Sequence, residues 1–359
     1  MTIHTLELLA FLTTKEYLRL RDCFFSHAVG QSALCYKSHR TVYFNQWNSW
    51  GVQCCLKKTP VGGVIHFRIN PSKLIGNSSP TALFEARGQN IDLLNLKISE
   101  ILNKFPVQKK IEDLGLFRLD LCADIPMKES WVLEYIRLLH KGHKTGKWEP
   151  VYFQDERDHH SFREKNKRYQ LTVYDKLYEL SEKGRIQSAP MDERILRIEV
   201  SLNAKGMNHY HYKCDMQSDT SCLDKLSEFS EAGRFIMVDV INKIFPYSPY
   251  FSLRKARELI YQSDFHRPKQ GKLCGFLAHI NRYRHVDTHA LSMTQNGKKR
   301  LEQLDRLGIN PVTIEARSGI PFLPPLQYLV KLYDRAKKPD SRDVYCFEGD
   351  TVCKNLSVR

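Results

Sequence analysis

Residues 117–124 read FRLDLCAD, a stretch in which polar and apolar side chains alternate. Successive side chains of a β-strand point to opposite faces, so one face here is apolar and the other carries Arg118, Asp120 and Asp124. A carboxylate in a sheet costs desolvation free energy unless it pairs with a cation. Two interpretations therefore stay open for Asp120: an ion pair with Arg118, or coordination of a metal ion.

A second strand repeats the pattern at residues 196–202, which read LRIEVSL. Arg197, Glu199 and Ser201 share one face, and the opposite face is entirely apolar. If this strand lies beside the first, Asp120 and Glu199 supply the hard oxygen ligands that Mg²⁺ or Mn²⁺ prefers. Clustered carboxylates of this kind support metal-assisted cleavage of a phosphodiester.

A third strand at residues 169–176 reads YQLTVYDK and places Thr172, Tyr174 and Lys176 on one face. A tyrosine hydroxyl can attack a phosphodiester and hold the strand as a covalent ester. A lysine on the same face can stabilise the charge of the phenolate or the phosphate. The alternative for Tyr174 is a half-buried strand aromatic without a chemical role, since tyrosine is common in strands.

The composition favours a polyanionic partner. The chain has 359 residues and a formal net charge of +15, with 55 Lys and Arg against 40 Asp and Glu. Such an excess is typical of proteins that bind DNA or RNA. The sequence shows no signal peptide and no apolar stretch long enough for a membrane span, so we expect a cytoplasmic protein with no membrane partner. Its ten cysteines include no CxxC pair, and we expect reduced thiols.

The periodicities predict an α+β fold in two parts: residues 1–215 as a catalytic domain, and residues 216–359 as a mainly helical, basic DNA-binding region. Strand patterns cover residues 41–56 (a hairpin), 63–70, 116–125, 169–177 and 195–202. Helical patterns cover residues 79–105 or 81–105, and 129–140, 223–245, 253–263, 275–283 and 294–307. Residues 254–300 hold eleven Lys or Arg and three Asp or Glu, which we expect to face phosphates.

The three strand motifs together resemble a known family. FRLDLCAD, YQLTVYDK and LRIEVSLN, in that order, are similar to motifs in the replication initiators of small staphylococcal rolling-circle plasmids and in the gene II replication proteins of filamentous phages. The run HFRINPSKLIG at residues 66–76 is similar to the segment before the first motif in both groups. The resemblance covers most of residues 60–310, and the joint order of the motifs is more specific than any one motif.

The resemblance implies a relaxase-like palm built on a central antiparallel sheet. Tyr174 falls on the family's nucleophile and Lys176 on its accompanying lysine. Asp120 and Glu199 fall on acids shared by both groups and are expected to bind the metal. Asp124 matches the plasmid proteins alone.

One ligand position departs from the family pattern. Arg68 stands where the plasmid family has a glutamate, and His66, two residues earlier on the same face, could replace that ligand. The alternative is a hydrogen-bonded surface histidine.

The function expected from the resemblance is initiation of rolling-circle DNA replication. A metal-dependent endonuclease would nick the origin of a phage or plasmid through a 5′-phosphotyrosine and later rejoin the displaced strand. Arg118 and Arg197 would orient the carboxylates or contact phosphate. The partners would be supercoiled and single-stranded origin DNA, a host helicase and a host polymerase, with a homodimer left open.

Three alternatives remain at this stage. His209 and His211 form a His-x-His pair that, on a strand, could bind a divalent metal, with Tyr210 or Tyr212 as the nucleophile. A non-catalytic DNA-binding regulator would use the basic helices but would not need Asp120, Tyr174 and Glu199 to converge. A nickase of conjugative transfer would share the chemistry.

Overall fold

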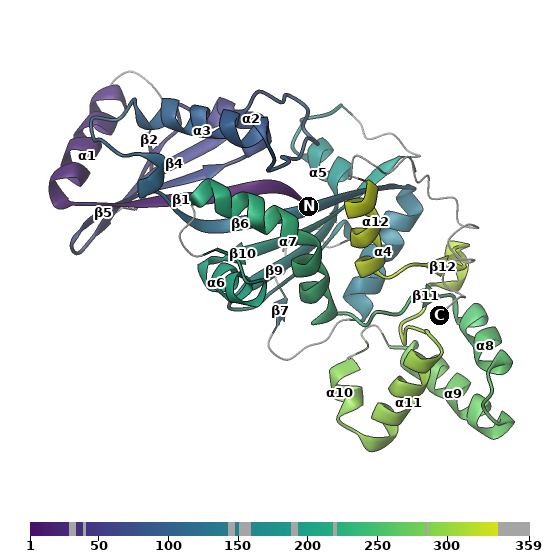
Figure 1. The fold of residues 1–359 in the computed structure, drawn as a ribbon. Coiled ribbons are helices and arrows are strands. Elements are labelled where there is room, and N and C mark those ends of the chain that lie inside the picture. The colour runs from purple at the N-terminus through teal and green to yellow at the C-terminus, as the bar shows by residue number, and fades with distance from the viewer. Residues whose placement is uncertain are drawn as a thin grey trace. The chain divides into compact units, whose positions relative to one another are not determined.

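The computed structural model describes residues 1–28, 34–38, 41–142, 148–150, 159–187, 193–217, 221–283, 286 and 288–336. This part of the chain is an α+β structure with one ten-stranded sheet and a helical C-terminal part, which confirms the predicted fold class (Figure 1). The strands of the sheet follow the order β2-β3-β4-β5-β1-β6-β10-β9-β8-β7. Pairs β1–β5, β1–β6, β2–β3, β3–β4, β4–β5, β7–β8 and β8–β9 run antiparallel.

The elements have the following bounds. The strands are β1 (Thr2–Leu12), β2 (Leu34–Ser38), β3 (Thr41–Phe44), β4 (Val52–Thr59), β5 (Gly62–Ile69), β6 (Gly115–Met127), β7 (Glu149–Pro150), β8 (Ser161–Lys165), β9 (Tyr169–Asp175), β10 (Arg194–Asn203), β11 (Tyr250–Phe251) and β12 (Phe322–Leu323). The helices are α1 (Thr14–Ala28), α2 (Pro71–Leu74), α3 (Gln89–Leu102), α4 (Glu129–Lys141), α5 (Lys176–Glu182), α6 (Ala204–Lys213), α7 (Cys222–Asn242), α8 (Leu253–Gln262), α9 (Arg267–Ile280), α10 (Thr288–Ser292), α11 (Gln295–Arg306) and α12 (Leu326–Ala336).

The chain forms two compact units. Unit 1 comprises Met1–Cys122, Lys167–Tyr169 and Val200–Gly233, and unit 2 comprises the remaining segments. The chain passes from one unit to the other inside β6, after Cys122, and inside β10, after Glu199. The division at residue 215 into a catalytic domain and a DNA-binding region stays a prediction. Within the predicted DNA-binding region, residues 337–359 lie outside the described residues.

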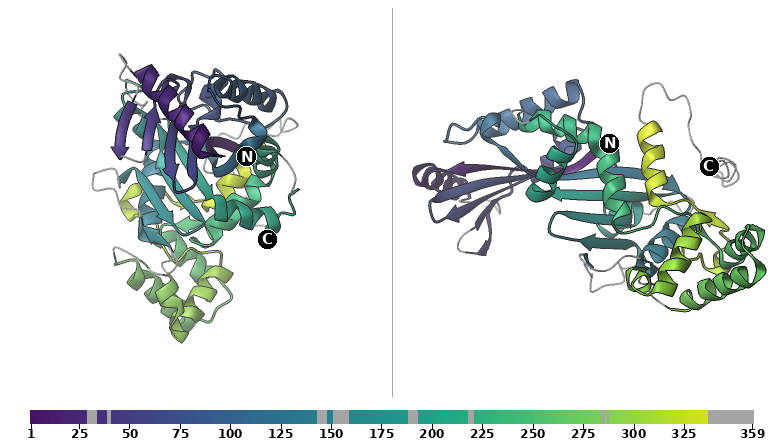
Figure 2. Two further views of the ribbon diagram at one scale, coloured as in Figure 1. Left: turned by 90° about the vertical axis from the view of Figure 1, so that its left-hand side faces the viewer. Right: turned by 60° about the horizontal axis from the view of Figure 1, so that its bottom comes forward.

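The core of unit 1 lies between α1 and the strands β4 and β5 (Figure 2). Thr13 and Glu16 begin α1 with a capping box, in which each side chain accepts a hydrogen bond from the other residue's backbone N–H. Phe24 of α1 stacks on Phe44 at 4.7 Å between ring centroids, and Trp47 packs edge-on against Phe44 at 5.0 Å. These large apolar contacts hold the helix on one face of the strands.

The core of unit 2 lies between α4 and the strands β8 and β9. Phe162 on β8 is the cross-strand neighbour of Val173 on β9, and both are buried. Helix α4 contacts β8, and its buried Tyr135 donates a 2.8 Å hydrogen bond to the carbonyl oxygen of Pro324. None of the helices in the described part of the chain combines the length and the apolar character that a membrane span requires.

Three sequence-based assignments of elements are corrected by the structure. Helix α3 starts at Gln89, so residues 81–88 precede the helix instead of forming its first turns. Lys176 is the first residue of α5 rather than part of β9, because Asp175 caps that helix by accepting a 3.0 Å hydrogen bond from the backbone N–H of Tyr178. Residues 204–213, which the His-x-His alternative required to be a strand, form α6, and Asn203 is its N-cap.

Candidate functional site

The polar faces of β6 and β10 carry the acidic residues singled out from the sequence. On β6 the opposite face buries Leu119, Leu121 and Ala123, each fully inaccessible to solvent. On β10 the apolar face buries Ile198 and Val200 to the same degree. Asp120 and Glu199 therefore leave the apolar core face and turn to the other side of their strands, although both remain buried, at 1% and 8% exposure.

His4 joins these carboxylates through an irregularity in β1. The pairing of β1 with β6 shifts from Ile3↔Leu121 to Thr5↔Asp120, so two steps on β1 correspond to one step on β6. His4 is the extra residue on β1, and an extra residue of this kind forms a β-bulge, which redirects a side chain out of the regular alternation. The bulge depends on strand register, so the alternation of residues within β1 does not predict His4 as a ligand.

His4, Asp120 and Glu199 form a group that could hold a metal ion. Each offers one ligand atom, and these atoms all lie within 4.8 Å of one another. The residues belong to β1, β6 and β10, which are neighbours in the order of the sheet. Two buried carboxylates side by side repel each other, and a divalent cation would offset that repulsion. Carboxylate oxygens suit Mg²⁺ or Mn²⁺, and the imidazole favours a transition metal such as Mn²⁺.

Arg118 supports Asp120 from the same strand. Its Nε donates to Oδ1 of Asp120 at 2.8 Å, and its Nη2 donates to Oδ2 at 3.0 Å. The same Nη2 donates to the hydroxyl of Ser201 on β10 at 3.1 Å. Each carboxylate oxygen has a further lone pair, so this ion pair fixes the orientation of Asp120 and still leaves it able to bind a cation. Both sequence interpretations of Asp120 are therefore compatible in one geometry.

Arg197 and Asp124 form a second ion pair between β10 and β6. Nε and Nη2 of Arg197 donate to the two carboxylate oxygens of Asp124, each at 2.6 Å, and Arg197 is fully buried. Along β6, Arg118 contacts Ser201 and Asp124 contacts Arg197, so the contacts follow opposite chain order on the two strands. This order shows that β6 and β10 run antiparallel. Asp124 lies outside the group formed by His4, Asp120 and Glu199.

Tyr174 occupies the polar face of β9 and is half-buried. Its cross-strand neighbour is Ser161 on β8, whereas the alternate residues Leu171 and Val173 are fully buried. Neighbouring strands place their apolar residues on the same side of a sheet, so Tyr174 shares the polar face of unit 2 with Arg197 and Glu199. The phenol is not sealed inside the apolar core.

Lys176 accompanies Tyr174 from the first turn of α5. Its Nζ lies 5.9 Å from the centroid of the Tyr174 ring and donates a 2.6 Å hydrogen bond to Glu179. Burial lowers the pKa of Lys176, and the nearby charge of Arg197 lowers it further. Because its side chain is nearly inaccessible to solvent, the charge of Lys176 acts in a medium of low dielectric.

His66 has partners of its own in unit 1. Its Nε2 lies 3.1 Å from Glu7 Oε2, and its Nδ1 lies 3.7 Å from Cys55 Sγ. The hydrogen bond with Cys55 and the hydrogen bond with Glu7 raise the pKa of His66 to about 9. A metal ligand must be a neutral imidazole, and these contacts favour the protonated ring. His66 lies outside the group that contains His4.

The alternative His-x-His site loses its geometric basis. His209 and His211 lie two residues apart on α6, and successive residues of a helix turn by about 100°, so the two rings point to opposite sides. On a strand they would have shared a face. Tyr210 is fully buried and Tyr212 is 83% exposed.

Comparison with known proteins gives a likeness among solved structures. No protein-family model and no curated protein matches the sequence. Among solved structures, the chain is similar to the "Structure of Rolling Circle Replication Initiator Protein from Geobacillus stearothermophilus". The two chains are 12% identical, and the alignment covers 60% of this chain and 77% of that chain with a TM-score of 0.29.

Proposed function

We propose that this chain is a rolling-circle replication initiator, a metal-dependent endonuclease that nicks one DNA strand through Tyr174 and later rejoins it. The observation that carries the proposal is the group formed by half-buried His4 and the buried carboxylates of Asp120 and Glu199. Its nucleophile is Tyr174, which presents a half-buried phenol on the polar face of β9 with the ammonium of Lys176 beside its ring.

A divalent metal held by His4, Asp120 and Glu199 would polarise the scissile phosphate and offset the charge that develops on it. The ion pair with Arg118 keeps Asp120 oriented for this task. Arg197 is fully buried and paired with Asp124, so its role on this face is to hold β10 against β6. A phosphodiester that enters this face would meet the charge of the metal, which would stabilise the phosphoryl transition state.

The covalent step conserves the phosphodiester bond energy. The phenol oxygen of Tyr174 forms a bond to phosphorus while the bond to the 3′ oxygen breaks, and that oxygen takes up a proton to become a free 3′-OH. The 5′ end remains attached to the protein as a phosphotyrosine. In the reverse reaction a 3′-OH attacks the phosphotyrosine and releases the phenol, so rejoining needs no ATP.

Lys176 favours the charged phenolate over the neutral phenol. A buried ammonium lowers the energy of a nearby anion more than an exposed one does, because water screens it less. The phenolate is the stronger nucleophile, and it is also the leaving group of the rejoining step. Lys176 thereby assists both directions of the transfer.

The cellular partners follow from the chemistry. The basic helices of residues 216–336 would bind supercoiled origin DNA through its phosphates. In the cytoplasm of the host cell, a host helicase would unwind the duplex and a host polymerase would extend the 3′-OH. Because the 5′ end of the nicked strand stays attached to the protein, a separate polymerase has to extend the free 3′-OH. A homodimer is compatible with this scheme.

Nicking of a supercoiled plasmid that carries the replicon's own origin tests the proposal. We expect open circles with the wild-type chain and Mn²⁺, and none with EDTA. Tyr174→Phe should abolish nicking and the covalent protein–DNA adduct seen on a denaturing gel, while Tyr212→Phe, a matched change of an exposed tyrosine, should retain both. Site-specific nicking by Tyr174→Phe would contradict the assignment of the nucleophile.

A further inference from the structure

Helices α10 and α11 are joined by a two-residue turn, Met293 and Thr294. The hydroxyl of Thr294 accepts a 3.1 Å hydrogen bond from the backbone N–H of Gly297 and donates one of 3.1 Å to the carbonyl oxygen of Leu291. A Cβ at Gly297 would lie 2.1 Å from the same carbonyl oxygen. The two helices therefore meet closely at a turn that only glycine permits, and Figure 1 shows them side by side.

Helix α11 is anchored on one side only. Leu304 is fully buried, and Arg300 lies over the ring of Phe276 on α9 at 5.2 Å from its centroid. Helix α9 also contacts α8, where Gln270 donates hydrogen bonds to the carbonyl oxygens of Tyr261 and Ser263. In this helical body a short helix, a tight turn and a second helix follow one another, and the second helix packs on α9. This order of elements is the one found in a helix-turn-helix.

The outward side of α11 carries residues that can recognise bases. Gln295, Asn296, Lys298 and Lys299 are all exposed and occupy its first two turns. Asparagine and glutamine can bond the major-groove edge of adenine in two places, and lysine can bond guanine. The first turn holds no acidic residue, although the N-terminal end of a helix normally favours one.

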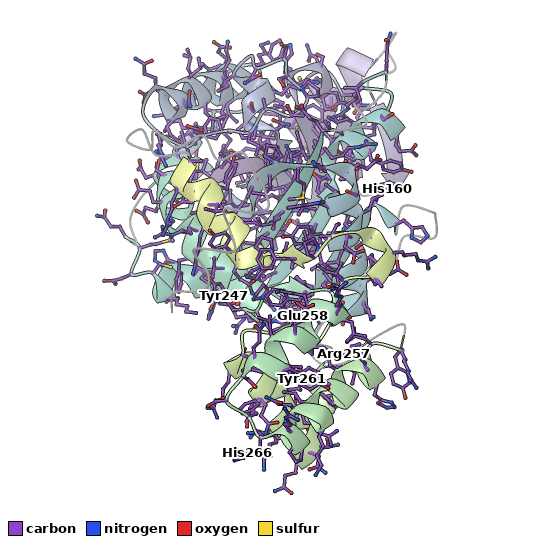
Figure 3. All side chains as sticks on the ribbon, turned by 90° about the vertical axis from the view of Figure 1, so that its right-hand side faces the viewer. His160, Tyr247, Arg257, Glu258, Tyr261 and His266 are labelled. Atoms are coloured by element: carbon purple, nitrogen blue, oxygen red, sulfur yellow. The ribbon has the colours of Figure 1, made fainter. Side chains whose placement is uncertain are left out.

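The charge of this segment is also unbalanced. Residues 295–300 hold three cations and no acid, and none of the ion pairs in the described part of the chain involves Lys298 or Lys299. Arg257 and Tyr261 on α8 add a further exposed cation and an exposed aromatic ring to the same helical body (Figure 3). Exposed lysines such as these complement a phosphate backbone.

We infer that α10 and α11 form a helix-turn-helix whose second helix enters the major groove of duplex DNA and reads bases with Gln295 and Asn296, while Lys298 and Lys299 contact the flanking phosphates. The assignment rests on the proposed function, because it takes DNA as the partner. Beyond the proposed function, it names α11 as the helix that recognises the DNA sequence, and it assigns recognition of the duplex and cleavage of the strand to different parts of the chain. An α-helix fits the major groove of B-form DNA, and the first residues of a recognition helix are those that reach the bases.

The test starts with a pool of DNA duplexes that contain a randomised core. The full wild-type chain, in EDTA to prevent nicking, should enrich a sequence motif from this pool. Gln295→Ala with Asn296→Ala should lower affinity for the enriched duplex by about tenfold or more and leave affinity for a scrambled duplex unchanged. All four positions are exposed on a helix, where alanine is well tolerated, so these variants should fold.

The lysines have a different expected signature. Lys298→Ala with Lys299→Ala should weaken binding to the enriched and scrambled duplexes alike. It should also reduce the slope of log affinity against log salt by about 2, one for each lost phosphate contact. Lys57→Ala with Lys58→Ala is the matched control, since it removes an exposed adjacent pair from β4 and should leave the duplex affinity and the slope unchanged.

Several outcomes would overturn the inference. The first is that the wild-type chain enriches no motif, and the second is that the Gln295 and Asn296 variant selects the same motif with the same affinity. The third is that an RNA duplex of the same sequence binds equally well, because the deep major groove of RNA excludes a helix. The proposed function fails differently. Tyr174→Phe should select the same motif as the wild type. If the wild-type chain nicks DNA through Tyr174 but enriches no motif, only the role of α11 is rejected.

Discussion

The guanidinium of Arg197 is fully buried and donates two hydrogen bonds of 2.6 Å to the carboxylate of Asp124 across strands β10 and β6. A buried charge is tolerated only when it is paired, so each of these residues makes the other necessary. The pair lies next to the residues assigned to catalysis, and its disruption should affect stability before it affects chemistry.

We predict that Asp124→Asn lowers the free energy of unfolding by about 3–5 kcal/mol, because it leaves the charge of Arg197 buried without its carboxylate. The double variant Asp124→Asn with Arg197→Met should be less destabilised than Asp124→Asn alone, since it buries no unpaired charge. Urea unfolding of the four proteins measures both values as a double-mutant cycle. If the unfolding free energies lost in the two single variants sum to the loss in the double variant, the two residues are not coupled.

The second prediction concerns the metal. His4→Ala should weaken Mn²⁺ binding about tenfold or more and reduce the preference for Mn²⁺ over Mg²⁺, because the imidazole is the ligand that favours a transition metal. Titration calorimetry on the purified chain measures this without reference to activity. His66→Ala is the matched control and should bind Mn²⁺ as the wild type does, since His66 bonds Glu7 and Cys55 instead. The reverse result would make His66 the ligand, as the resemblance suggested.

Much of this site was predictable from alternation alone. The period of two at residues 117–124, 169–175 and 196–202 placed Asp120, Tyr174 and Glu199 on polar strand faces, because a strand with one buried face allows a single register. The structure confirms the strands and the α+β class. What brings Asp120 and Glu199 together is the pairing of β6 with β10, about 80 residues apart along the chain, which from the sequence was only a hypothesis because alternation within a strand does not specify its neighbours.

Other features depended on local signals that were present but not used. Asn203 before Ala204, and Asp175 before Lys176, are helix N-caps that preceded α6 and α5. The His-x-His alternative required a strand at these residues, whereas the cap at Asn203 favours a helix. His4 had no such signal, because a bulge arises from the register of two strands and not from the residues within one.

The third prediction concerns pH. The pKa of His66 is raised to about 9 in the folded chain, so its interactions with Cys55 and Glu7 stabilise the fold fully below pH 6.5, the ordinary value. That contribution should fall as the pH rises from 6.5 to 9, by at most about 3 kcal/mol. Unfolding free energies measured across this window should show the loss. His66→Gln should show a flatter curve, and identical curves would remove His66 as the cause.

The fourth prediction contrasts two glycines in the helical body. Gly275 lies in the middle of α9, is exposed, and has nothing within 4 Å of the position of a Cβ. Gly275→Ala should therefore stabilise the chain by up to about 1 kcal/mol through helix propensity. Gly297→Ala should destabilise it, because its Cβ would meet the carbonyl oxygen of Leu291. Urea midpoints that shift in the same direction would contradict the close turn between α10 and α11.

The last prediction separates two lysines that share one partner. Lys176 and Lys183 both donate hydrogen bonds to Glu179, but Lys176 is buried beside the ring of Tyr174 and Lys183 is about half exposed. Lys176→Met should slow Tyr174-dependent nicking by about 10²–10³-fold with unchanged DNA affinity, the size expected when a charge that stabilises the reacting anion is lost. Lys183→Met should nick at nearly the wild-type rate.

The pH dependence of nicking adds a second readout for Lys176. Burial and the charge of Arg197 lower its pKa, so the ammonium loses its proton at a lower pH than an exposed lysine does. The wild-type rate should rise with pH as the phenolate forms and then fall as Lys176 is neutralised, whereas Lys176→Met should lack the falling limb. A slow Lys176→Met variant that keeps the falling limb would assign the loss of rate to packing around α5 and remove Lys176 from the reaction.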